Sequence, residues 1–162
     1  MPLIGIRRIR RFALLALMPA VVLIAASCSF NREWRKAGRN PDAPAALEGR
    51  WEGNWISEVN YHHGKLRCIV SKDGDAYRAR FHAKYLKILG FGYTVELKAE
   101  ATGNGYKFHG EADLGVMGGV YRYEGHADTT NFVSTYSSKY DHGTFQMQKR
   151  REEYWNNGMS SE

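Results

Sequence analysis

Cysteine and proline are scarce in this chain, which has two cysteines and four prolines among 162 residues. Two cysteines can close at most one disulfide, which excludes a small fold held together by several disulfides. Cys68 alternates with Leu66 and Val70, and this spacing predicts a buried, unreactive thiol. Helical periodicity is missing after residue 48, and no glycine-rich phosphate loop precedes a helix. The chain therefore lacks the sequence signature of a nucleotide-binding enzyme.

Acidic residues are missing from the first 27 positions, which carry four arginines followed by an apolar run over residues 13–26. This pattern predicts a secretory signal peptide over residues 1–27, because the run is shorter than the roughly 20 apolar residues of a transmembrane helix. Without this segment 19 basic and 17 acidic residues remain, and the formal charge falls from +6 to +2. So small a charge gives no basic surface for phosphate groups, and we expect no nucleic-acid partner.

Small residues precede the first cysteine in the sequence Ala25-Ala26-Ser27-Cys28. This segment resembles the lipobox of bacterial lipoproteins, in which the cysteine carries the lipid. The resemblance implies that lipidated Cys28 anchors the protein in a membrane of the bacterial cell envelope, facing the periplasm or the exterior. The alternatives are ordinary cleavage, which leaves Cys28 as a terminal thiol, and an uncleaved anchor.

The segment that follows has mixed charge, two prolines and no sustained period. Residues 28–48 are therefore predicted to be the lipidated N-terminus and a flexible linker, with Trp34 as a candidate for packing on the folded part. At the other end, residues 151–162 are predicted to be a polar tail. The folded domain is expected over residues 49–150.

Alternation of apolar and polar residues dominates residues 49–150. In the run 76–85, for example, Tyr77, Phe81 and Tyr85 share one face while charged residues lie on the other. Eight such runs occur, at residues 50–58, 64–72, 76–86, 91–102, 105–113, 119–127, 131–138 and 143–150, and short turns separate them. The pattern predicts an all-β fold, an eight-stranded antiparallel up-and-down barrel, with an eight-stranded sandwich as the alternative.

A short motif, Gly49-Arg50-Trp51, opens the first predicted strand. It resembles the GxW signature of the calycins, the superfamily of lipocalins, fatty-acid-binding proteins and avidins. The resemblance implies a barrel whose floor is closed by Trp51 beneath a basic side chain of the last strand, either Lys149 or Arg150. The lipocalin disulfide and the further lipocalin motifs are missing, so the likeness is one of architecture.

Two segments 15 residues apart, beginning at Tyr106 and Tyr121, repeat a pattern of two aromatics and a glycine on one face. Symmetric pairing would place Tyr106 opposite Gly125 and Gly110 opposite Tyr121, so that rings cover glycines that bend the sheet. Chance similarity between two amphipathic strands is the alternative.

The two ends of the predicted barrel differ in their loops. One end has tight polar turns, and the other has longer loops with apolar and aromatic residues. This asymmetry predicts a closed floor and an open, partly apolar mouth. Because the first strand begins and the last strand ends at the floor, both termini and the anchor are expected there, with the mouth facing away from the anchor.

Inward-facing aromatic residues near the mouth are the candidates for binding a small apolar or amphipathic ligand. They are Trp55, Tyr85, Phe91, Tyr93, Tyr121, Tyr123, Tyr136 and Phe145. The alternative is a structural or interaction lipoprotein in which these rings fill the interior. Such a protein would contact an envelope protein partner through apolar loop residues, namely Leu86, Ile88, Leu89, Val116 and Met117.

No constellation of catalytic residues and no cofactor motif stands out. His62, His63 and His142 fall in mouth loops near Asp141, and together they would offer nitrogen and oxygen ligands to a metal ion. No known metal-binding spacing supports such a site. We therefore expect a binding or interaction protein without cofactor or metal rather than an enzyme.

Overall fold

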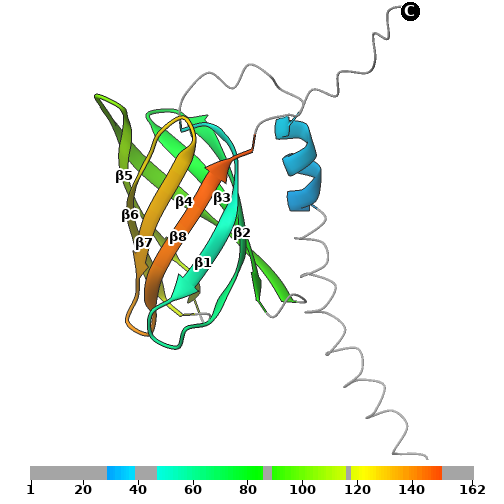
Figure 1. Cartoon of the computed structure of the whole chain (residues 1–162), viewed down its shortest axis with the longest axis vertical. Coiled ribbons are helices and arrows are strands. Elements are labelled where there is room, and N and C mark those ends of the chain that lie inside the picture. The colour runs from blue at the N-terminus through cyan, green and yellow to red at the C-terminus, as the bar shows by residue number, and fades with distance from the viewer. Residues whose placement is uncertain (1–28, 39–46, 86–88, 116–117, 151–162) are drawn as a thin grey trace, which may run out of the picture.

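The alternating runs form eight antiparallel strands that close into a barrel in sequence order (Figure 1). The computed structural model describes residues 29–38, 47–85, 89–115 and 118–150. The strands are β1 (Gly49–Ser57), β2 (His63–Asp73), β3 (Ala76–Tyr85), β4 (Leu89–Thr102), β5 (Gly105–Asp113), β6 (Val120–Ala127), β7 (Asn131–Ser137) and β8 (His142–Lys149). Each strand end lies within two residues of its predicted position. The predicted all-β barrel is confirmed, and the sandwich alternative is excluded.

Pairing of β1 with β8 closes the barrel, from Trp51 opposite Lys149 to Ser57 opposite Gly143. The two strands approach each other closely where glycines lie between them. A Cβ atom on Gly53 or on Gly143 would lie 2.0 Å from a carbonyl oxygen of the facing strand. Glycine at both positions therefore lets the last strand reach the first, so that neither strand keeps a free edge.

Side chains fill the floor half of the barrel. Cys68 and Val70 point inward from β2 and are buried, and burial raises the pKa of the free Cys68 thiol. This confirms the predicted buried, unreactive cysteine. At the centre of the interior, the Phe81 ring lies 5.2 to 6.5 Å from four neighbouring rings, those of Tyr93, Tyr123, Phe132 and Phe145.

Trp51 seals the floor, as the calycin resemblance implies. It is fully buried, and its indole N–H donates a hydrogen bond to the carbonyl oxygen of buried Leu47 at 3.0 Å. The Lys149 ammonium lies 5.0 Å from the Trp51 ring centroid. Arg150 does not take this place. Its side chain is exposed while its backbone N–H donates to the Arg50 carbonyl, because the β1–β8 register sets Lys149 directly opposite Trp51.

The register of β5 and β6 differs by two residues from the symmetric pairing predicted from the repeat. Tyr106 lies opposite Ala127 rather than Gly125, and Gly110 lies opposite Tyr123. The prediction was wrong because Gly118 and Gly119 both have positive φ angles and belong to the turn, so that β6 begins later. A shift of two residues keeps the same side chains inside, and an aromatic ring still faces each glycine.

A helix over residues 29–38 packs against the outside of the barrel, within the segment predicted to be a flexible linker (Figure 1). Phe30 and Trp34 are four residues apart and share one face of this helix, where they are only 1% and 9% exposed. The linker prediction is wrong for these ten residues, because two large apolar side chains in so short a segment give little periodic signal. The rest of the predicted linker up to residue 46 lies outside the described residues.

Charged side chains on the outer faces of β1, β2 and β3 form the surface beneath the helix. The guanidinium carbons of Arg50 and Arg67 lie 5.3 and 5.1 Å from the Trp34 ring centroid. The Phe30 ring stacks on His82, with centroids 4.9 Å apart. Burial and nearby cations lower the pKa of His82, which favours the neutral imidazole in this stack.

The described helix lies along the barrel wall and runs toward the floor (Figure 1). Phe30 stacks on His82, whereas Trp34 lies over Arg50, which is two residues closer to the floor in the strand register. The N-terminal end of the helix therefore points toward the mouth end of the barrel. The first strand begins and the last strand ends at the floor, as expected, but the helix returns the chain along the wall, and the expected anchor at Cys28 lies outside the described residues.

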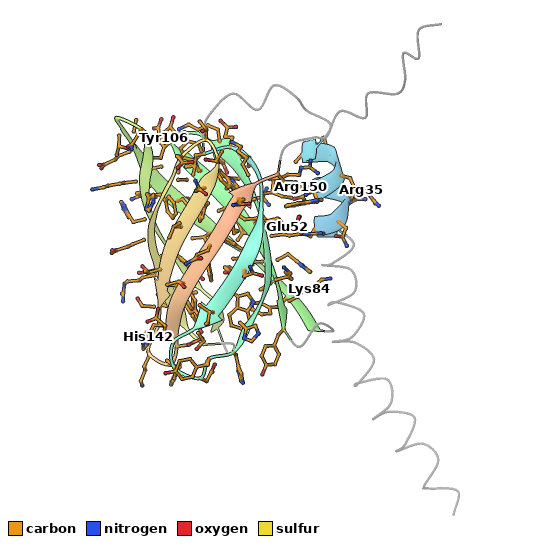
Figure 2. The ribbon with its side chains drawn as sticks, viewed as in Figure 1. Arg35, Glu52, Lys84, Tyr106, His142 and Arg150 are labelled. Atoms are coloured by element: carbon orange, nitrogen blue, oxygen red, sulfur yellow. The ribbon has the colours of Figure 1, made fainter. Side chains whose placement is uncertain are left out.

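We predict that Trp34→Ala releases the helix from the barrel wall while the barrel stays folded. The substitution removes a buried ring and two cation–π contacts, which are worth about 0.5–1 kcal/mol each at such sites. Hydrogen exchange should become faster at the amides of residues 30–38 and remain slow in the strands. Arg35→Ala is the matched control, because Arg35 is exposed on the opposite side of the helix (Figure 2). Equal exchange in both variants would contradict the docking described here.

Candidate functional site

The mouth half of the barrel is hollow. A cavity of about 450 Å³ lies between the inner faces of the strands and the loops at the mouth end, which is the end marked by His142 in Figure 2. Its lining consists of Trp55, Leu66, Ala83, Phe91, Gly92, Tyr93, Asp113, Leu114, Tyr121, Tyr123, Tyr136, Asp141 and Phe145. Seven of the eight predicted ligand-binding residues belong to this set, so these rings border an open space.

Five of the lining rings form a continuous aromatic wall that crosses from β4 through β6 to β7. Phe91 stacks on Tyr93, Tyr93 on Tyr123, and Tyr123 on Tyr121, with centroids 6.1 to 6.4 Å apart. Tyr121 then reaches Tyr136 at 6.0 Å. Each ring holds the orientation of the next, so the wall presents a fixed apolar surface to the cavity.

Tyrosine hydroxyls supply neutral polar groups within this wall. Burial raises the pKa of Tyr93, Tyr123 and Tyr136, and the Asp141 carboxylate adds to the effect at Tyr136. All three hydroxyls therefore stay protonated at neutral pH, where each can donate or accept a hydrogen bond.

Asp141 is fixed at the lip of the cavity by two hydroxyl donors. Ser57 Oγ donates to Asp141 Oδ1 at 2.6 Å, and the Tyr136 hydroxyl donates to Asp141 Oδ2 at 3.3 Å. The fully buried Ser57 hydroxyl also accepts hydrogen bonds from the backbone N–H groups of Val59 and Asn60. One serine thus joins the β1–β2 loop to the carboxylate in the β7–β8 loop.

A second carboxylate, that of Asp113, lies at the end of β5, beside the neighbouring mouth loop. Its Oδ1 accepts a hydrogen bond from the Gly115 backbone N–H at 2.8 Å. Asp113 and Asp141 are the two charged residues among the described residues that line the cavity, and both are acids. A ligand in the cavity therefore meets apolar rings in the interior and negative charge at the entrance.

Tyr85 is the one predicted ligand-binding residue that lies outside the cavity lining. Its ring packs on Trp55 with centroids 6.3 Å apart, and its hydroxyl lies 3.2 Å from His62 Nδ1. Tyr85 is the last residue of β3, where the alternation predicts an inward side chain. The ring packs instead beside the β1–β2 loop and covers Trp55, which lines the cavity.

Sequence reasoning missed both carboxylates of the lip as lining residues. Asp113 ends β5 after the inward-facing Ala112, so the alternation assigns it to the outer face. Asp141 lies in a turn, where alternation gives no information about direction. The small residue Ala83 was also missed as a lining residue, although it leaves room that a larger side chain would occupy.

Several predicted residues lie outside the described part of the chain. These are Cys28 and the signal peptide, the loop residues Leu86, Ile88, Val116 and Met117, and the tail 151–162. Leu89 is described as the first residue of β4, opposite Tyr85. The predicted partner loops therefore have no described side-chain structure.

The mouth histidines do not converge on a metal-binding cluster within the described ranges, where no group of three metal-ligating residues occurs. His62 packs on Tyr85, and His63 Nδ1 lies 3.2 Å from the Tyr61 carbonyl oxygen. His142 lies 4.0 Å from the Glu58 carboxylate. These contacts give each histidine a local partner in its own loop or a neighbouring one.

Among the residues for which a structure is described, no helix has the length and apolar character needed to cross a membrane. The chain matches no protein-family model, no curated protein and no solved structure, and its function must be argued from the cavity itself.

Proposed function

We propose that this protein is a lipid-anchored envelope protein that binds a small apolar or amphipathic molecule in the mouth cavity. The observation that carries the proposal is the aromatic cavity of about 450 Å³ at one end of a barrel whose other end is filled. Its volume falls in the range of about 300–1,000 Å³ that small-molecule sites occupy. Side chains alone can fill the interior of an eight-stranded barrel, so the open volume favours a binding role over a purely structural one.

The polar groups of the cavity favour a ligand with a hydrogen-bond donor at one end. Asp113 and Asp141 offer carboxylate oxygens at the lip, and tyrosine hydroxyls lie deeper along the wall. Because both charges are negative, a hydroxyl, an amine or an ammonium group suits the entrance better than a carboxylate or a phosphate. The apolar body of the ligand would contact the rings.

Anchoring through Cys28 is part of the proposal and rests on the lipobox-like sequence Ala25-Ala26-Ser27-Cys28. The docked helix is described from residue 29, the residue that follows this cysteine. An attached lipid would therefore hold the barrel close to the membrane surface with little intervening chain.

A second candidate is an interaction lipoprotein that contacts another envelope protein through its mouth loops. The observation in its favour is the exposure of apolar residues there, including Val59, Tyr61 and Tyr140. The two functions differ in the role of the cavity, which only the first requires.

We predict that partly filling the cavity weakens ligand binding. N-phenylnaphthylamine, a neutral apolar dye that fluoresces in dry surroundings, should bind the protein saturably at a single site. Ala83→Leu places extra atoms in the cavity and should weaken binding at least about tenfold. Ala101→Leu, at an exposed position near the floor, is the matched control and should leave binding unchanged. Circular dichroism checks that both variants fold, and unchanged binding in folded Ala83→Leu would refute the assigned site.

Asp141→Asn should reduce the preference of the cavity for cations. Asparagine can still accept from Ser57, but the negative charge at the lip is lost. Competition with the dye would compare phenylpropylamine, a cation at neutral pH, with the neutral phenylpropanol. The affinity for the amine should fall about tenfold, while the affinity for the alcohol should stay the same. Glu58→Gln, an exposed acid of the neighbouring loop, is the control, and an equal loss in both variants would count against a role for Asp141.

Cys28→Ser should abolish incorporation of a clickable fatty acid in growing cells. The serine hydroxyl replaces the thiol that would carry the lipid, while the fold of the barrel is untouched. Labelling of the purified protein followed by gel fluorescence gives the result, with Cys68→Ser as the control that should remain labelled. Full labelling of Cys28→Ser would rule out this attachment site.

A further inference from the structure

The exposed large apolar side chains gather at one end of the barrel. Across the described residues they are Ile56, Val59, Tyr61, Val120 and Tyr140, and we call this set the mouth rim. The rim residues lie at the mouth ends of β1 and β6 and in the β1–β2 and β7–β8 loops. The floor turns carry polar residues instead, in the sequences KDGD, TGNG and DTTN. Such one-sided exposure marks a contact surface.

The β1–β2 loop holds Tyr61 in an unfavourable backbone conformation. Tyr61 has a φ of 59°, a left-handed value that costs a residue with a side chain of order 1–2 kcal/mol. Ser57 maintains this geometry, because its backbone oxygen accepts from the Tyr61 N–H and its hydroxyl accepts from Val59 and Asn60. The Tyr61 side chain is nonetheless 75% exposed, so the strained loop projects an aromatic ring into the surroundings.

The rim combines apolar, aromatic and cationic groups in the way that suits a membrane–water interface. Tyr61 and Tyr140 are strongly exposed tyrosines, a residue type enriched at the level of lipid headgroups. The Lys139 ammonium lies 5.4 Å from the Tyr140 ring centroid. Lys65 and Lys84 add exposed cations at the mouth end, where Glu58 and Asp113 are exposed acids, so this end carries charges of both signs. The lysines can contact headgroup phosphates, and the acids can contact the ammonium groups of phosphatidylethanolamine.

The docked helix brings the N-terminal side of the chain toward the same end of the barrel. Ser29 contacts Arg80 partway along the wall, and the helix N-terminus points toward the mouth (Figure 1). The described helix therefore runs away from the mouth, and its first described residue lies on the barrel wall rather than at the floor.

We infer that the mouth rim contacts the headgroup region of a lipid bilayer, so that the cavity opens toward the membrane. The rim is small, and an apolar contact of this size binds a bilayer only marginally unless a second attachment is present. Its role is to orient the barrel, while the N-terminal attachment supplies the affinity. The affinity from the N-terminal attachment and the exchange of ligand with the membrane both rest on the proposed function, but the direction in which the rim faces does not.

Fluorescent probes placed at the two ends of the barrel test the orientation. Tyr61→Cys and Tyr140→Cys put a thiol on the rim, and Asp75→Cys and Asn104→Cys put one in the exposed floor turns. Each full-length chain is labelled with an environment-sensitive fluorophore and added to phosphatidylethanolamine and phosphatidylglycerol vesicles that contain a doxyl-lipid quencher. The unsubstituted chain, labelled in parallel, gives the background from its own cysteines. We expect at least about twofold quenching at both rim positions and none at the floor positions.

Quenching at the floor positions instead, or at neither end, would overturn the inference. The vesicles contain no other protein. Absence of quenching at the rim would therefore show that the rim does not contact lipid and would favour a protein partner instead. Val59→Asp should reduce the quenching of the probe at position 140, whereas Asn104→Asp, the same change in charge at the floor, should not. Binding of the neutral dye to the same chains in solution is measured separately. Loss of dye binding with intact rim quenching would reject the ligand proposal alone, and the reverse result would reject the membrane contact alone.

Discussion

Closure of the β1–β8 seam is the constraint on which the rest of the structure depends. Once the last strand pairs with the first, an eight-stranded barrel has an interior whose width is fixed by strand number and tilt. Side-chain volume then decides which parts of the interior are solid. In the floor half, side chains such as Trp51 and Phe132 pack against one another and fill the interior. In the mouth half, the rings stack along the wall and Ala83 contributes little volume, so the space between them stays open as the cavity.

The outer wall shows how charged residues can form a packing surface. Arg50, Arg67 and Arg80 lie on the outer faces of three adjacent strands, where alternation alone assigns them to solvent. In the structure their guanidinium carbons lie 5.1 to 5.7 Å from the ring centroids of Phe30 and Trp34 of the helix. The helix is therefore held by contacts between rings and guanidinium groups, together with the Phe30–His82 stack and the Arg80–Glu33 ion pair. This arrangement explains why its sequence resembles that of a linker.

Alternation was enough to predict the eight strands and the inward position of most cavity residues, because a period of two is a direct consequence of strand geometry. Alternation cannot detect a register shift of two residues, because such a shift leaves every side chain on the same face of the sheet. The predicted pairing of β5 with β6 was therefore wrong. At strand ends alternation could not decide whether Lys149 or Arg150 lies over Trp51, and it wrongly placed the Tyr85 side chain in the cavity lining. Side-chain direction at these positions depends on the path of the adjoining loops. Asp141 could not be assigned to the lip, because its position follows from the hydrogen bond with Ser57, 84 residues away in the sequence.

Trp51 and Leu47 close the floor of the barrel, and this limits the path that a ligand could take into or out of the cavity. A barrel that is open at both ends would let a ligand pass through, whereas a barrel with a closed floor would take up and release a ligand through the mouth. Any change that promotes release of a ligand would then have to act at the mouth. Among the described residues the floor shows no second opening, so a ligand bound as proposed would be stored, shielded or presented rather than conducted.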